Sequence, residues 1–166
     1  MSVPEDVGGG WQAAAMDDDA RVPLAGAHLL ASFFAAAPAL GHPAIRARVP
    51  RVRAHLLTYL DTEGEQWLPP DELVLLHAER QLEPVDAVLR VSGVELVLAA
   101  LPGFCHPVWL LPQPRDARAQ LRVVDALRDW VAEHHRPPDP AGRLLLDRVE
   151  EAVRRAQAVL DGSPAP

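Results

Sequence analysis

The amino-acid sequence predicts an α+β fold that is predominantly helical, with four to five helices flanking a small antiparallel meander. Apolar residues recur at helical spacing along most of the chain. The exception is 84–112, which is dense in Val and Leu and contains two hairpin-like turns. Because such a segment can also form short buried helices, an all-α bundle is the alternative fold.

The chain has the length and composition of one globular domain. Its 166 residues are 49% hydrophobic and 23% charged, which is too apolar for a disordered protein. We place the domain at 21–162. Residues 1–20 are rich in Gly, Ala and Asp and are expected to form a disordered arm, and 163–166 to form a flexible tail.

Three helices are predicted in the N-terminal half. Residues 23–37 are apolar nearly all round, which is typical of a central helix. A second helix opens at Pro43 and is broken or kinked at Pro50. Its apolar stripe consists of Ile45, Val49, Val52, Leu56 and Leu60. A third helix starts at 69–72, where two prolines precede two acids, and runs to about Gln81.

Two longer helices are predicted at the C-terminal end. Residues 114–135 align Leu121, Val124, Leu127 and Val131 on one face. The last helix has Asp139 as its N-cap, opens at Pro140 and closes at Gly162. Its apolar stripe consists of Leu146, Val149, Val153, Ala156 and Leu160. On its polar side the i,i+4 spacing predicts two ion pairs, Glu150–Arg154 and Glu151–Arg155.

The segment 84–112 can be interpreted in two ways. As strands, 85–91, 94–101 and 107–111 form a meander with turns at 92–93 and 102–106. As helices, Ser92 and Glu95 form a capping box that opens a short helix ending at 102–103. The density of Val and Leu and the two turns favour the strands.

The charge and cysteine content narrow the class of protein. The formal net charge is -7, which makes nucleic acid an unlikely partner. The chain is arginine-rich and lysine-free, and its single cysteine, Cys105, allows no internal disulfide, so we expect a cytoplasmic protein. Residues 22–40 are apolar enough to raise the question of a membrane span. Pro and Gly interrupt that stretch, which instead predicts a buried helix and makes a membrane an unlikely partner.

No complete catalytic, metal or cofactor site is present. Cys105 and His106 are adjacent, so on a strand their side chains would point to opposite faces and could not act as nucleophile and base. His134 and His135 lack the i,i+4 spacing that places two imidazoles on one face of a helix for a metal ion. We therefore predict no catalytic residue, no metal ligand and no cofactor.

The best candidate binding site is an arginine run that precedes an acidic segment. Its residues are Arg46, Arg48, Arg51, Arg53 and His55. Arg48 and Arg51 are three residues apart and face away from the apolar stripe. We therefore expect both to contact an acidic surface, either on another protein or on 61–86 of a second copy, although pairing within the chain or plain solvation is the alternative.

These features predict a non-enzymatic binding or regulatory module that acts through protein–protein contacts and self-associates as a homo-oligomer. Two alternatives remain open. One is a small enzyme or ligand-binding domain that uses Cys105 near a pocket. The other is a nucleic-acid-binding regulator that uses the 46–53 arginines.

Overall fold

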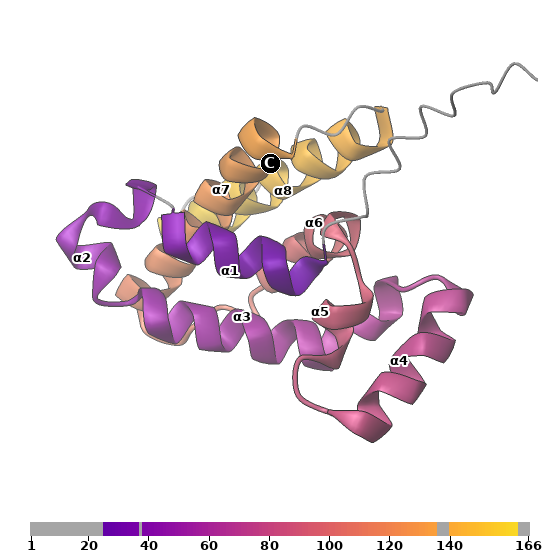
Figure 1. The fold of residues 1–166 in the computed structure, drawn as a ribbon. Helices are drawn as coiled ribbons and strands as arrows, with labels where there is room; N and C mark the ends of the chain where they lie inside the picture. Colours follow the sequence, from indigo (N-terminus) through magenta and orange to yellow (C-terminus); the bar gives the residue numbers. More distant parts are fainter. Residues whose placement is uncertain (1–24, 37, 136–139, 163–166) are drawn as a thin grey trace, which may run out of the picture.

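The computed structural model describes residues 25–36, 38–135 and 140–162, and every regular element within these ranges is a helix (Figure 1). The two 3-10 helices are η1 (Pro38–Gly41) and η2 (Gly64–Trp67). The α-helices are α1 (Gly26–Ala36), α2 (Pro43–Arg46), α3 (Val49–Glu63), α4 (Pro70–Leu82), α5 (Ala87–Val91), α6 (Val94–Phe104), α7 (Pro114–His134) and α8 (Pro140–Leu160).

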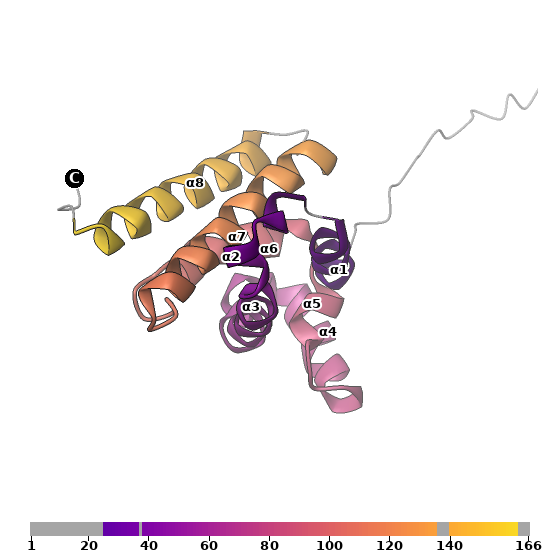
Figure 2. The ribbon, with the colours of Figure 1, turned by 90° about the vertical axis from the view of Figure 1, so that its left-hand side faces the viewer.

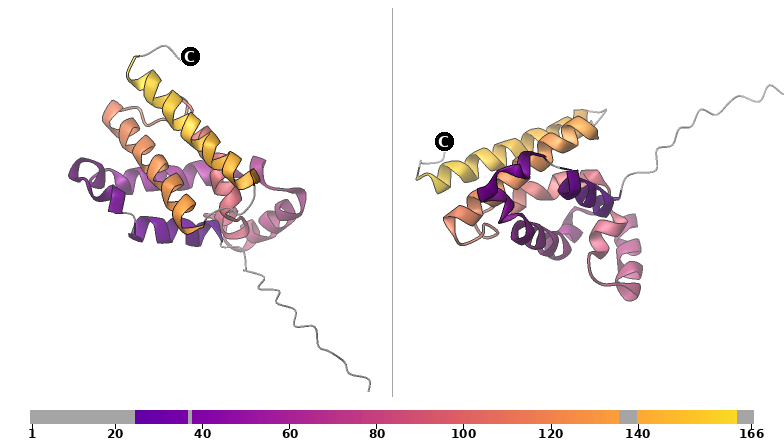
Figure 3. Two further views of the ribbon diagram at one scale, coloured as in Figure 1. Left: turned by 90° about the horizontal axis from the view of Figure 1, so that it is seen from above. Right: turned by 60° about the vertical axis from the view of Figure 1, so that its left-hand side comes forward.

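The helices form a layered bundle with one helix at its edge. Helices α7 and α8 pack side by side, α8 also lies on α6, and α7 lies on α3 (Figures 2 and 3). Helix α1 packs on α5 and α6 at the other side of α3. Helix α4 rests mainly on α5 and projects away from the α7–α8 pair (Figure 2).

The two C-terminal helices form as their apolar spacing predicts. Leu121, Val124, Leu127 and Val131 are all buried on α7, as are Val149, Val153 and Ala156 on α8. Arg154 and Arg155 form the predicted pairs with Glu150 and Glu151, at N–O distances of 3.1 and 3.5 Å. Gly162 adopts a φ of 74°, a left-handed conformation that glycine adopts easily where a helix ends.

The predicted antiparallel meander is wrong, and the alternative all-helical interpretation is the right one. No strand occurs in the described ranges, and 84–112 instead contains α5 and α6. Helix α6 buries six side chains around most of its circumference, between α8, α3 and α1. A helix buried on nearly every side needs no polar face, so its Val and Leu density imitates that of a buried strand.

The start of α6 also differs from the predicted capping box. Gly93 is the N-cap and no side chain caps the helix, while the Ser92 hydroxyl is buried with no hydrogen-bond partner among the described residues. The apolar run does not end at Pro102, which lies inside the last turn of α6.

The N-terminal predictions hold in outline. The predicted interruption near Pro50 is a break and not a kink: α2 ends at Arg46 and α3 begins at Val49. Pro50 occupies the first turn of α3, where its missing N–H costs no hydrogen bond. Val52, Leu56 and Leu60 are buried, and α4 forms where its start motif predicts. Residues 1–20, 23–24, Asp139 and 163–166 lie outside the described residues. No helix in the described ranges has the length and apolarity needed to cross a membrane.

Candidate functional site

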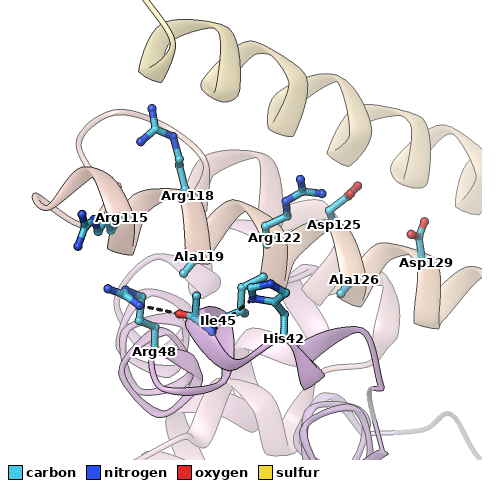
Figure 4. Close-up of a pocket in the computed structure, with 11 residues that line it drawn as sticks. His42, Ile45, Arg48, Arg115, Arg118, Ala119, Arg122, Asp125, Ala126 and Asp129 are labelled. Carbon is cyan, nitrogen blue, oxygen red and sulfur yellow. Dashed lines mark hydrogen bonds between the residues drawn. The ribbon is translucent and has the colours of Figure 1, made fainter.

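A groove with a volume of about 790 Å³ runs between α2 and the first four turns of α7 (Figure 4). Residues of α2 and of the start of α3 form one wall of the groove, and residues of α7 form the other. The lining residues are His42, Ala44, Ile45, Arg48, Arg115, Arg118, Ala119, Arg122, Asp125, Ala126 and Asp129. The volume lies in the range of ligand-binding clefts in proteins.

Helix α7 places three arginines on the same wall. Arg115, Arg118 and Arg122 follow one another at i, i+3 and i+7, which brings their side chains to one face of a helix. Ala119 and Ala126 lie on the same face, while the buried stripe of α7 points the opposite way. Folding of α7 onto the core therefore turns the arginines outward into the groove.

Two of these arginines have no partner among the described residues. Arg115 and Arg122 make no hydrogen bond or ion pair there, whereas Arg118 contacts the carboxylate of Asp161 at 3.2 Å. Both members of that pair are more than half exposed, so their contact stabilises the fold little and Arg118 can exchange it for a ligand. Arg115 is the second residue of α7, so the positive end of the helix dipole adds to its positive potential.

The other end of the groove carries acids. Asp125 and Asp129 line it, and both contact Arg128, at 3.1 and 2.6 Å. Arg128 also binds Glu150 of α8 at 2.8 Å. Because a single arginine is shared among these carboxylates, this end stays acidic, and the positive charge of the groove is concentrated at the Arg115 end.

Two residues of the predicted site hold α3 against the start of α7. Arg48 Nε lies 2.9 Å from Asp116 Oδ1, and Arg51 Nη1 lies 2.8 Å from Asp116 Oδ2. The Asp116 side chain is only 12% exposed, so it is a nearly buried carboxylate with two charged donors. Arg48 also donates to the Ala44 carbonyl at 2.6 Å and lines the groove opposite Arg115 (Figure 4).

The other three predicted residues lie apart from one another. Arg46 donates to the Gly41 carbonyl at 2.6 Å, and the guanidinium of Arg53 lies 5.5 Å from the centre of the Phe34 ring. His55 is half-buried, with its Nε2 2.8 Å from the Trp109 carbonyl oxygen and its ring against that of Phe104. Of the five residues, only Arg48 reaches the groove.

The three α7 arginines were missed in the sequence. Their spacing of three and four residues on a segment predicted to be helical was the signal that could have found them. Spacing alone, however, only predicts a solvated basic face, because the opposite wall comes from residues about 70 positions earlier in the chain.

Cys105 lacks the properties of a catalytic thiol. Its side chain is buried, and burial raises the pKa of the thiol from 9.0 to about 12. A thiol with that pKa stays protonated at neutral pH and is a poor nucleophile. Within the described ranges, no group of three His, Cys, Asp or Glu side chains is arranged to hold a metal ion.

Comparison with known proteins adds no relative: no family model, curated protein or solved structure matches this chain. The groove is therefore the feature of the molecule from which a function is inferred.

Proposed function

We propose that the protein is a non-enzymatic binding module that recognises an acidic segment of a partner protein in the groove between α2 and α7. The observation that carries this proposal is the set of three arginines on one wall, of which Arg115 and Arg122 have no partner among the described residues. Arginine binds carboxylates through two parallel hydrogen bonds, so such a wall is suited to Asp and Glu side chains.

The length of the groove favours a polypeptide over a small anion. Arg115 and Asp129 bound it along α7, and 14 residues of helix extend about 21 Å. An extended peptide of roughly six residues covers that distance. A single phosphate or carboxylate would occupy only one end.

The floor of the groove indicates what else the segment contains. Ala44, Ile45, Ala119 and Ala126 provide an apolar surface between the charged residues. Burying apolar side chains there adds affinity, while the arginines fix the position of the acids. We therefore expect a segment that combines Asp or Glu with one or two aliphatic residues.

A phage-displayed library of random 12-residue peptides tests the proposal without a known partner. Peptides selected on the wild-type protein should be enriched in Asp and Glu. Their affinity, measured by fluorescence anisotropy with labelled copies, should fall roughly tenfold or more in the Arg115→Glu/Arg122→Glu variant, because two charge-assisted contacts become repulsive.

The matched control is Arg143→Glu/Arg148→Glu, which makes the same charge change at exposed positions of α8 outside the groove. This variant should bind the selected peptides almost as well as the wild type. Selected peptides with no excess of acids, or equal losses in the two variants, would contradict the proposal.

A further inference from the structure

The charged residues of the groove are separated by sign along α7. Arg115, Arg118 and Arg122 lie toward the start of the helix, and Asp125 and Asp129 follow them (Figure 4). Within the described part of the chain, none of these arginines forms an ion pair with either aspartate. The groove therefore offers a ligand a positive end and a negative end, and not one uniformly basic wall.

The negative end is only partly neutralised by its neighbours. Asp125 and Asp129 both contact the same nitrogen of Arg128, Nη2, so one guanidinium serves two carboxylates. Arg128 also contacts Glu150, whose other oxygen lies 3.1 Å from Arg154. The Asp129 side chain is 66% exposed, so its carboxylate is accessible to a ligand. Two aspartates that share one arginine leave a net negative charge at this end.

We infer that the groove also recognises a basic residue of its ligand, which Asp125 and Asp129 bind while the arginines bind the acids. This inference rests on the proposed function, because one peptide segment would occupy both ends of the groove. A carboxylate binds the side chain of Lys or Arg through charge-assisted hydrogen bonds. A uniformly acidic segment would instead place an acid against Asp129 and be repelled. The two aspartates therefore select the position of the ligand along the groove and disfavour segments that carry acids alone.

The distance between the two ends fixes the spacing of the charges in the ligand. Arg118 and Asp129 are separated by 11 positions of α7, which corresponds to about 16 Å of helix. An extended peptide covers that distance in roughly five residues. Between the two ends, Ile45 and Ala126 provide an apolar floor for the residues in the middle of the segment. The expected ligand has acids at one end, a short aliphatic stretch, and a base at the other end.

Three synthetic peptides of identical composition test the charge pattern by fluorescence anisotropy. In two of them, a pair of glutamates and a pair of arginines flank four aliphatic residues, once in each order along the chain. In the third, the same charges alternate. One of the separated peptides should bind the wild-type protein roughly threefold to tenfold more tightly than the alternating peptide, because each exposed ion pair adds a small factor to the affinity. Equal affinities of all three peptides would overturn the inference.

Asp125→Asn/Asp129→Asn should abolish the preference for the separated peptide, with an unchanged helical circular dichroism spectrum. The matched control is Glu133→Gln/Asp147→Asn, which removes two exposed acids outside the groove. This control should keep the preference of the wild type. A preference that survives in the first variant, or that disappears equally in both, would contradict a role for the two aspartates.

A gain of binding provides a test that a misfolded variant cannot pass. A peptide with glutamates at both ends of the same aliphatic stretch should bind the wild type weakly. It should bind Asp129→Arg several-fold more tightly, because a repulsive contact becomes an attractive one. An unchanged affinity in this variant would mean that Asp129 does not face the ligand.

The proposed function and this inference fail in different ways. If the acid-only peptide binds the wild type as tightly as the separated peptides and loses affinity in Arg115→Glu/Arg122→Glu, recognition of an acidic segment stands and the inference is overturned. If no peptide binds, or if binding does not respond to that arginine variant, both are overturned.

Discussion

Helices α7 and α4 are both surface helices with a proline in the first turn, yet they use their apolar residues in opposite ways. Helix α7 turns Leu121, Val124 and Leu127 into contact with α8 and α3 and leaves its arginines outside. Helix α4 buries Leu76 and leaves Leu75 and Leu82 outside. The comparison shows that apolar residues at helical spacing predict a helix, although they do not by themselves predict which side of that helix is buried.

The difference also separates two kinds of surface on one molecule. The exposed side of α7 is cationic and lines a groove, so it is suited to a charged partner. The exposed side of α4 is apolar, and Val74, Leu75 and Leu82 are each more than half exposed there. Three measurements test whether the two helices differ in this way.

The largest expected effect is on the stability of the covered helices. Leu127 is fully buried on α7, and Leu127→Ala should lower the free energy of unfolding by about 2–4 kcal/mol, as truncation of a buried leucine usually does. Val153→Ala on α8 should cost an amount at the lower end of the range. Denaturant titration measures both. Losses below about 0.5 kcal/mol in both variants would mean that this face is not the core.

The second effect concerns pH. Burial raises the pKa of the Cys105 thiol from 9.0 to about 12, and burial together with nearby Glu63 and Cys105 raises the pKa of Tyr59 from 10.0 to about 12. Since both groups hold their protons more tightly in the folded state, stability is intact below pH 9 and falls as the pH rises towards 12.

Cys105→Ala isolates the thiol contribution. The stability difference between wild type and this variant should shrink by about 2–3 kcal/mol between pH 8 and pH 11, because only the wild type loses that contribution. Denaturant titrations at several pH values provide the comparison. A difference that stays constant with pH would show that the thiol is not desolvated.

The smallest effect should come from the outer face of α4. Leu82→Ser should change the free energy of unfolding by less than about 0.5 kcal/mol, because Leu82 is 83% exposed. Thermal unfolding of the variant and the wild type measures the difference. A large loss of stability would mean that α4 packs more tightly than its exposure indicates.

The helices that sequence reasoning predicted well share one property. In 114–134 and 140–160, apolar and polar residues alternate with a period close to 3.6, because one face meets the core and the other meets water. The segment 94–104 lacks that period because it is buried nearly all round, and its density of Val and Leu therefore favoured a strand although it forms a helix. Only its position between α8, α3 and α1 resolves the choice.

The sequence alone predicts local features: where α7 and α8 begin and which of their faces is apolar. Which distant residues pair with each other depends on the tertiary structure. Arg48 and Arg51 bind Asp116, which lies 68 and 65 positions further along the chain, and the groove exists because α2 is brought opposite α7. The reason is physical. Helix spacing depends on neighbours within one or two turns, whereas the choice between an intramolecular carboxylate, a ligand and water depends on how distant helices pack.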